Sequence, residues 1–452
     1  MGKDKIANQL TDEDYKIIKA SMSKQDQIPE QIKHQTLTEK WPDPLAPEAF
    51  HGLAGDIVKA IEPHTEADPA ALLISFKVLY GNVIGRQAHF TAEADKHYLN
   101  LFACLVGTTS KGRKGVSLRQ VKQFFQSDEQ WARDRITHGM SSGEGLIWAV
   151  RDEQRELKRH KKGEEVEIIT VDGVDDKRLV VIESEFASTI RVLRREGNTL
   201  SAIVRKAWDD GNLQALTKNS PAKATEAHIS ILGHITKDEL LRYLDNTEAA
   251  NGFGNRFLWF CVSRSKCLPE GGQLQAVDFS SIVERLTDAV KFGRQTGEIK
   301  RDDQARLLWC DIYPDLSEGK PGLTGSMLAR SEAQVMRVAC IYALLDLSNV
   351  VRTEHLTAAL AVWDYVEASA RFIFGNSIGD PLADEIKEVL KKAGEDGMTK
   401  TEIHNHFGRH KKTKDINRAL NVLAERGITR FVKLTDTGGR TAEKWFINKV
   451  AN

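Results

Sequence analysis

The sequence predicts an α/β fold in which helices cover a mostly parallel sheet. Helical patterns alternate with short apolar runs at 101–106, 136–140, 179–182, 229–232 and 257–262. Apolar strands spaced by helices are typical of a parallel sheet that is covered on both faces. The first run leads into a glycine- and lysine-rich loop, and a helical pattern follows that loop. This strand–loop–helix order predicts a core built around a phosphate-binding loop.

Composition excludes some classes of protein and leaves others open. Lys+Arg and Asp+Glu are equal at 64 each, so net charge gives no sign of a nucleic-acid partner. The five cysteines are scattered without a CxxC pair, which favours reduced thiols and a cytoplasmic location over disulfides or a zinc site. No apolar run reaches 18 residues, and no apolar stretch follows the charged N-terminus. We therefore expect no membrane-spanning helix, no membrane partner and no signal peptide.

The loop after the first strand is similar to the G-x-x-x-x-G-K-[ST] pattern of phosphate loops. Gly107 and Gly112 have the required separation, but Arg113 occupies the usual lysine position and Lys114 follows it. We expect Lys114 to neutralise phosphate oxygens and Ser117 to bind Mg²⁺. ATP and Mg²⁺ are the expected cofactors, and the predicted nucleotide contacts are Gly107, Thr108, Thr109, Ser110, Lys111, Gly112, Arg113, Lys114, Gly115 and Ser117. The alternative is a basic surface turn.

Acidic residues follow two of the predicted strands. A nucleotide hydrolase uses an acid at the end of a neighbouring strand to hold Mg²⁺ and another to polarise the attacking water. Glu183, directly after 179–182, is predicted to lie on the metal side, and Glu185 to take a second role. Glu144, in the loop after 136–140, is a second candidate for the catalytic base. Solvated acids at strand ends are common, so a structural role is the alternative.

Two further polar residues suit roles in a nucleotide-driven machine. His234 follows the strand at 229–232 and is a candidate sensor of the terminal phosphate, with a hydrogen-bonded structural histidine as the alternative. Arg256 precedes the last strand and follows a glycine-rich turn. It is a candidate arginine finger for a neighbouring subunit, and a surface salt bridge is the alternative. Arg330 and Arg337 are weaker candidates for the same role.

The chain of 452 residues exceeds what one hydrophobic core usually holds, so several domains are expected. Three helical patterns and a hairpin pattern after residue 381 indicate a winged helix-turn-helix. We expect five segments: a flexible polar arm (1–45), an N-terminal helical segment (46–98), a P-loop ATPase core (99–270), a helical lid (271–378) and a C-terminal winged helix (381–452).

The last of these segments is locally basic. It holds 15 Lys/Arg and 10 Asp/Glu residues, and between 409 and 433 the numbers are 8 and 2. The side chains expected to contact DNA phosphates are Lys411, Lys412, Lys414, Arg418 and Arg440. A protein-interaction module is the alternative reading of the same segment.

Several longer stretches carry a family resemblance. They include Trp41-Pro-Asp-Pro-Leu, Gly107–Ser117, Ser141-Ser-Gly-Glu-Gly-Leu-Ile, Glu183-Ser-Glu-Phe-Ala, Gly233-His-Ile-Thr and Ala250-Asn-Gly-Phe-Gly-Asn-Arg-Phe-Leu-Trp. Over roughly residues 40–375 the chain resembles the YfjI-like ATPases of phages, plasmids and integrated elements. The segment 329–339 also resembles the lids of AAA+ proteins of the MCM helicase type. The resemblance implies a P-loop ATPase in the replication of a mobile genetic element, with any primase or initiator supplied by another chain.

Two functions follow as hypotheses. The favoured one is an ATP-dependent DNA helicase or translocase that forms a homo-oligomer, a hexameric ring being one form. The alternative is a replication initiator or regulatory DNA-binding protein whose ATPase core acts as a switch. A defence-related NTPase of a mobile element ranks third. The predicted lid favours the AAA+ branch, whereas the position of Glu144 favours the RecA-like branch.

Overall fold

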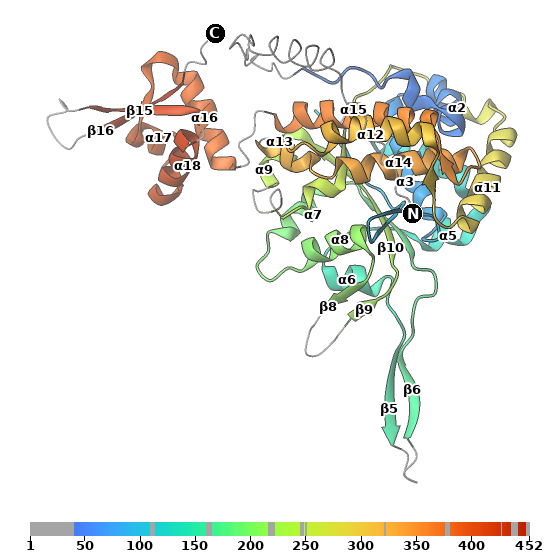
Figure 1. Ribbon diagram of the computed structural model, residues 1–452. Helices are drawn as coiled ribbons and strands as arrows, with labels where there is room; N and C mark the ends of the chain where they lie inside the picture. Colours follow the sequence, from blue (N-terminus) through green and yellow to red (C-terminus); the bar gives the residue numbers. More distant parts are fainter. Residues whose placement is uncertain are drawn as a thin grey trace, which may run out of the picture. The chain divides into compact units, whose positions relative to one another are not determined.

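The five predicted strands form one sheet in the computed structural model (Figure 1). The structure describes residues 40–108, 114–159, 165–215, 222–244, 248, 251–320, 322–375, 380–425, 427–434 and 442–448. The strands are β3 (Phe102–Gly107), β4 (Ile136–His138), β7 (Arg178–Glu183), β10 (His228–Thr236) and β11 (Phe257–Cys261). All neighbouring strands run parallel in the order β11-β3-β10-β7-β4. The predicted parallel α/β sheet is thus confirmed, and it is consistent with a Rossmann- or P-loop-like core.

The central strand β10 aligns the ends of its two neighbours. Thr236 of β10 pairs with Gly107 of β3, and Gly233 pairs with Glu183 of β7. In chain order the sheet reads 5-1-4-3-2, so the fourth strand separates the first from the third. The carboxyl ends of all three strands therefore meet at one edge of the sheet, where ligands of open α/β folds usually bind.

Helices cover both faces of the sheet. From α3 (Pro69–Val83), the Asn82 side chain donates to Ser230 Oγ of β10 at 3.3 Å. At Gly233 an added Cβ would lie 2.9 Å from the first residue of α7 (Phe186–Leu193). Positions 230 and 233 point to opposite sides of a strand, so α3 and α7 lie on opposite faces.

The large unit contains many shorter elements around this sheet. Before and between the sheet strands lie η1 (Pro47–Phe50), α2 (Gly52–Ile61), η2 (Glu62–His64), α4 (Lys114–Lys122), η3 (Gln123–Asp128), α5 (Glu129–Asp134), α6 (Gly143–Trp148), α8 (Leu200–Asp209), α9 (Lys237–Tyr243) and η4 (Gly254–Arg256). After the sheet come η5 (Leu274–Ala276), α11 (Ser280–Gln295), β12 (Lys300–Arg301), α12 (Asp303–Ser317), α13 (Gly322–Leu328), α14 (Ser331–Leu345), β13 (Val350–Val351) and α15 (Thr353–Phe374).

The three predicted segments between 46 and 378 share one hydrophobic core, whose buried residues run from Leu45 to Phe374. Helix α15 covers the backbone of the edge strand β11. The Tyr365 hydroxyl donates to Cys261 O at 2.6 Å, and Ser369 Oγ accepts the Cys261 N–H at 3.1 Å. The helices predicted as a lid are therefore anchored to the sheet edge.

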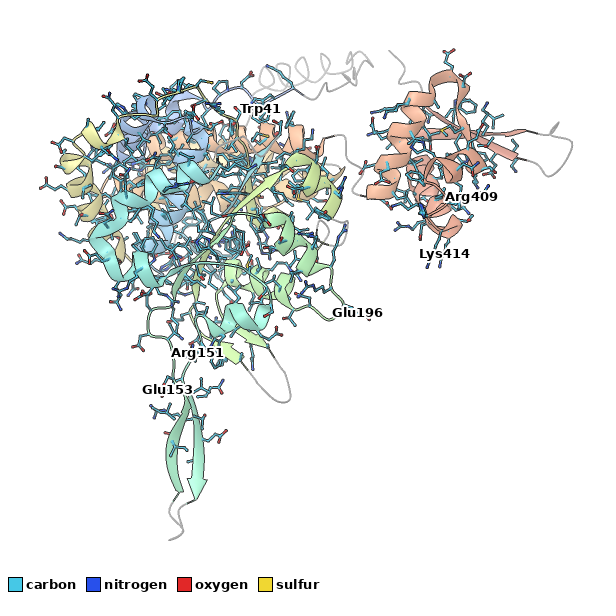
Figure 2. The ribbon with its side chains drawn as sticks, turned by 180° about the vertical axis from the view of Figure 1, so that it is seen from behind. Trp41, Arg151, Glu153, Glu196, Arg409 and Lys414 are labelled. Carbon is cyan, nitrogen blue, oxygen red and sulfur yellow. The ribbon has the colours of Figure 1, made fainter. Side chains whose placement is uncertain are left out.

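Residues 151–167 are mostly charged or polar, and the sequence predicts a solvated excursion there without strands. The structure has β5 (Gln154–Arg159) and β6 (Glu165–Val171), an antiparallel ribbon exposed to solvent (Figure 2), with Arg151 and Glu153 at its base. Charged residues are uncommon in strands, so the sequence did not predict this ribbon. The hairpins β1 (His89–Ala92) with β2 (Asp95–Tyr98), and β8 (Leu213–Ala215) with β9 (Ala222–Ala224), were also not predicted.

Residues 380–448 have a separate hydrophobic core around Leu390, Leu420 and Trp445. The elements are α16 (Pro381–Ala393), η6 (Gly394–Asp396), β14 (Met398–Thr399), α17 (Lys400–His406), α18 (Thr413–Glu425), β15 (Thr429–Leu434) and β16 (Ala442–Ile447). The strands form an antiparallel sheet in the order β14-β16-β15. The three predicted helices and the hairpin strands are thus present, while the predicted turn at 436–439 and most of the arm at 1–45 lie outside the described residues.

Candidate active site

A cavity of about 930 Å³ opens at the carboxyl ends of β3, β10 and β7. It is lined by Lys114, Gly115, Val116, Arg119, Ser184, Glu185, Ala187, Arg191, His234, Ile235, Thr236, Glu239 and Arg264. Its volume lies in the range of small-molecule and cofactor sites. The cavity brings together four predicted site residues, Lys114, Gly115, Glu185 and His234, from three distant parts of the sequence.

Lys114 is the first residue of α4. Burial lowers its pKa, and the negative charge of Glu239, on the same cavity, opposes that shift. Of the predicted loop, Gly107 ends β3, Thr108 is exposed, and Gly115 lines the cavity. The other predicted loop contacts lie outside the described residues: Thr109, Ser110, Lys111, Gly112 and Arg113.

Ser117 and Glu183, the predicted magnesium ligands, do not line the cavity among the described residues. Ser117 is buried one turn into α4, and its hydroxyl donates to Lys114 O at 2.7 Å. Glu183 is 6% exposed, and its Oε1 accepts the Met140 N–H at 2.5 Å. Both side chains bond to backbone atoms, so their predicted roles as magnesium ligands stay predictions. Glu185 is the acid at this strand end that faces the cavity.

His234 lies on the central strand with 4% of its surface exposed. Burial, and to a lesser extent the positive charge of Lys114, lower its pKa to about 4. The imidazole is therefore neutral at pH 7. Its Nε2 has no hydrogen-bond partner within the described part of the chain. A buried polar atom normally has a partner, so this nitrogen is available to a ligand or a bound water.

Next to His234, a capping box fixes the start of α9. Thr236 Oγ1 accepts the Glu239 N–H at 3.3 Å, and Glu239 Oε2 accepts from the Thr236 hydroxyl at 2.8 Å. This pair holds the Glu239 carboxylate at the cavity, on the side from which its charge acts on Lys114.

Arginines form the part of the cavity that the sequence did not predict. Arg119, Arg191 and Arg264 come from α4, from α7 and from the segment after β11. With Lys114 they place four cationic side chains at the cavity, against the carboxylates of Glu185 and Glu239 and that of Glu66, which pairs with Arg264. Such an excess of positive charge suits a ligand with several negative charges.

Glu144, the second predicted base, lies in the first turn of α6 and outside the cavity lining. Its Oε1 accepts the Thr199 hydroxyl at 2.9 Å. The helix start itself is set by Ser142, whose side chain accepts the Gly145 N–H at 3.0 Å. These contacts fit the structural alternative that the sequence left open for Glu144.

Arg256 is buried in an internal ion pair. Its side chain is 6% exposed, and Nη2 donates to both Asp209 carboxylate oxygens at 3.0 and 2.8 Å. Arg330 lies 3.7 Å from the same carboxylate but keeps 37% of its side chain exposed. Arg337 is fully buried and donates to Asn100 O and Trp208 O. The predicted arginine finger at Arg256 is thus replaced by a buried ion pair, and Arg330 is the accessible member of the group.

The predicted DNA contacts lie at the start of α18. Lys411, Lys412, Lys414 and Arg418 are all exposed, whereas Arg440 lies outside the described residues. Arg418 pairs with the buried Asp380 at 3.0 Å. The exposed cations therefore remain close together on one helix end.

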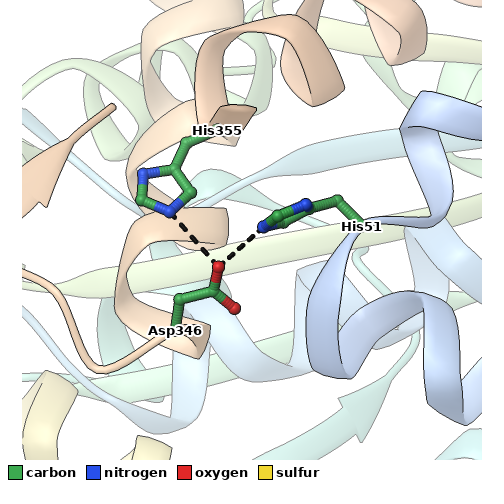
Figure 3. Close-up of side chains that lie close together, drawn as sticks. All are labelled: His51, Asp346 and His355. Carbon is green, nitrogen blue, oxygen red and sulfur yellow. Dashed lines mark hydrogen bonds and ion pairs between the residues drawn. The ribbon is translucent and has the colours of Figure 1, made fainter. Parts of the chain in front are cut away.

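His51, Asp346 and His355 form a cluster with the residue types of a metal site (Figure 3). Asp346 Oδ2 lies 2.6 Å from His51 Nε2 and 3.3 Å from His355 Nε2. The Nδ1 atom of His355 accepts the Arg352 N–H at 3.0 Å. A neutral His355 therefore carries its proton on Nε2 and donates it to Asp346, so that nitrogen has no lone pair for a metal. The cluster instead joins the start of α2 to α14 and α15 by hydrogen bonds.

Among the described helices, none combines the length and the apolar character that crossing a membrane requires. Comparison of the chain with protein-family models and with curated proteins finds no match. The resemblance to YfjI-like ATPases therefore stays a prediction that depends on the sequence motifs.

Proposed function

We propose that the chain is a P-loop-type ATPase that acts as an ATP-dependent DNA helicase or translocase in the replication of a mobile element. One observation carries the ATPase proposal: Lys114, His234 and Glu185 meet in one positively charged cavity at the carboxyl ends of parallel strands. Strand–loop–helix connections of this kind bind phosphates with backbone N–H groups at the helix start.

The proposed chemistry assigns each side chain of the cavity a task. Lys114 neutralises oxygens of the phosphate chain, since it begins the helix that follows the phosphate loop. Glu185, exposed to the cavity, accepts a proton from the attacking water or orients that water. Neutral His234 hydrogen-bonds the terminal phosphate through Nε2. Water then attacks the terminal phosphorus, and the products are ADP and inorganic phosphate.

Oxygen donors that suit magnesium line this cavity, since hydroxyl and carboxylate oxygens are suitable ligands for Mg²⁺. The exposed Ser184 hydroxyl would hold the ion beside Glu185, whose carboxylate acts on the attacking water. Ser117 suits the role less well, because it is buried and does not line the cavity among the described residues. The ion would neutralise charge on the phosphate oxygens when bound.

For the assembly we propose a homo-oligomer in which a neighbouring subunit contributes an arginine. Arg330 suits this role better than Arg256, since it is the more exposed of the two arginines that share Asp209. The helices at 280–374 would then act as the lid. The unit at 380–448 supports a winged-helix assignment through its order of elements, and its exposed α18 cations suit contacts with DNA phosphates.

The ATPase proposal is tested by Lys114→Ala, with Lys122→Ala as the matched control. Lys122 is an exposed lysine on the same helix and lies outside the cavity lining. We expect Lys114→Ala to abolish ATP turnover while circular dichroism and melting stay unchanged, and Lys122→Ala to keep turnover. Hydrolysis at the wild-type rate in Lys114→Ala would reject this site.

The exposed cations at the start of α18 favour a second candidate function, a replication initiator or regulatory DNA-binding protein with an ATP switch. A forked DNA substrate separates the two functions. A helicase opens the fork only with hydrolysable ATP. An initiator binds duplex through 381–452 with sequence preference and opens no fork under any nucleotide condition.

A further inference from the structure

The order of the strands determines the order in which the cavity residues lie across the sheet. Arg264 follows β11, Lys114 begins the helix after β3, His234 lies on β10, and Glu185 follows β7. These strands are consecutive neighbours in the sheet, and each step between neighbours is about 4.8 Å. The cavity therefore extends over about 14 Å, with Arg264 at one end and Glu185 at the other.

Arg191 lines this cavity from helix α7. It sits in the last turn of α7, the helix that starts directly after Glu185. Ala187 and Arg191 are four residues apart and so share one face of the helix, and both line the cavity. The position of Arg191 is thus set by the same helix that follows the proposed catalytic acid.

The guanidinium of Arg191 is open to a ligand. It is exposed, its Nη2 donates to Ser188 Oγ at 3.0 Å, and it lies 5.4 Å from the ring of Tyr243. Within the described ranges no carboxylate pairs with it at salt-bridge distance. Arg264 differs because it pairs with Glu66. Of the two, Arg191 is therefore the one whose charge is not already compensated by an acid.

We propose that Arg191 is a catalytic residue that contacts the terminal phosphate of ATP from within the same subunit. This inference rests on the proposed ATPase function and names a residue for it. As water attacks the terminal phosphorus and the bond to the leaving ADP oxygen breaks, negative charge spreads over the phosphate oxygens. The planar guanidinium binds two such oxygens at once and keeps its own proton, while the proton of water passes to Glu185.

This placement differs from an arginine supplied by a neighbouring subunit. Arg256 and Arg330 lie beside Asp209, which ends α8. Arg256 precedes β11, so this group lies at the end of the sheet strands opposite to the cavity. Neither lines the cavity that holds Lys114. A contact from Arg191 needs no partner, because α7 and α4 belong to one chain.

The test compares Arg191→Gln, Arg191→Lys and the control Arg194→Gln. Arg194 ends the same helix and is exposed, but it lies outside the cavity lining. We expect Arg191→Gln to lower kcat about 100-fold, with less than threefold change in ADP affinity. Arg191→Lys should recover part of the loss, and Arg194→Gln should match the wild type. Trapping of ADP with aluminium fluoride, which mimics the transferred phosphoryl group, should fail in Arg191→Gln.

A mixing experiment distinguishes an arginine that acts within its own subunit from one that a neighbouring subunit supplies. Equimolar Arg191→Gln and Glu185→Gln chains should show no turnover beyond the sum of the separate proteins, because Glu185 and Arg191 must be intact in the same chain. Recovery on mixing would overturn the contact within one subunit, and so would wild-type kcat in Arg191→Gln. Failure of the wild type to bind ATP at all would instead refute the ATPase proposal, and the role of Arg191 with it.

Discussion

Acidification is expected to destabilise the large unit through the two histidines of its central strand. His228 begins β10 and is 1% exposed, and His234 lies near the other end with 4% exposed. Burial lowers the pKa of His228 to about 3, against an opposing hydrogen bond to Gly81 O. Burial and the charge of Lys114 lower the pKa of His234 to about 4. Both imidazoles are therefore neutral in the native protein at pH 7.

The sign and size of the effect follow from proton linkage. In the unfolded chain a histidine has a pKa of about 6.5, so between pH 6.5 and pH 4 the unfolded state binds protons that the native state does not. Stability therefore falls as the pH decreases through this window and is insensitive to these groups above about pH 7.5. Each histidine should cost about 2 kcal/mol of unfolding free energy at pH 5 relative to pH 7, and the pair about 4 kcal/mol.

Urea unfolding at pH 7 and pH 5 measures this difference. All tryptophans except Trp445 lie before residue 376, so fluorescence reports mainly on the large unit. Replacement of His228 by Gln removes one titrating group and should reduce the pH 7 to pH 5 loss by about 2 kcal/mol. The control is His138→Gln, since His138 is an exposed residue of the same sheet.

The stability of His228→Gln at pH 7 is a separate quantity. Loss of the bond to Gly81 O should lower it by about 1 kcal/mol, and this cost is present at both pH values. The linkage argument would fail if wild type and His228→Gln lost the same free energy between pH 7 and pH 5. It would also fail if acidification stabilised the wild type.

Three further outcomes are expected. Ser117→Ala should keep magnesium-dependent ATP turnover within threefold of wild type, because Ser117 is buried and does not line the cavity among the described residues; a loss of 100-fold would show that Ser117 binds the metal. Asp380→Ala removes the cap on Leu382 and Ala383 N–H and the pair with Arg418, so hydrogen exchange in α16 should show about 2 kcal/mol less protection; unchanged protection would contradict the capping role. Zinc should leave the melting temperature unchanged, since His355 Nε2 carries a proton; a zinc-dependent rise that His51→Ala removes would show the opposite tautomer.

The elements that the sequence predicted best are those with strong local signals. Buried parallel strands are continuous apolar runs, so 179–182 located β7 to within a residue at each end. Asp68 accepts the Ala70 N–H at 2.9 Å, and α3 begins at Pro69, since Asp followed by Pro is a common start of a helix. The strand order was out of reach, because an apolar run carries no information about which strand lies beside it. The ribbon β5–β6 was missed because polar and charged residues dominate β5, although β6 carries four Val and Ile residues.

For the candidate site, the sequence predicted which residues lie near the strand ends, but it did not predict which way their side chains point. Residues that follow strand ends had to gather at one edge, which is why Glu185 and His234 meet in the cavity. The side chain of Glu183 points elsewhere because Met140 N–H, from a loop distant in sequence, binds its carboxylate. Ser117 lies a full turn beyond the helix start, and that register depends on where α4 begins. No sequence motif predicted the cavity arginines Arg119, Arg191 and Arg264. Arg191, for example, has no fixed sequence spacing from the other residues that line the cavity.

Because of the strand order, the residues proposed for ATP hydrolysis come from one chain and do not depend on contacts between subunits. Lys114, His234, Glu185 and Arg191 reach the cavity from three neighbouring strand ends and one helix of a single chain. The groups proposed to bind phosphate and to orient water all belong to one chain, so the proposed hydrolysis does not need a neighbour to bring them together. The Arg256–Asp209 pair, buried and away from that cavity, can then serve the fold or an interface without being required for hydrolysis. We therefore propose that turnover by isolated subunits and its stimulation on assembly depend on different arginines, Arg191 and Arg330.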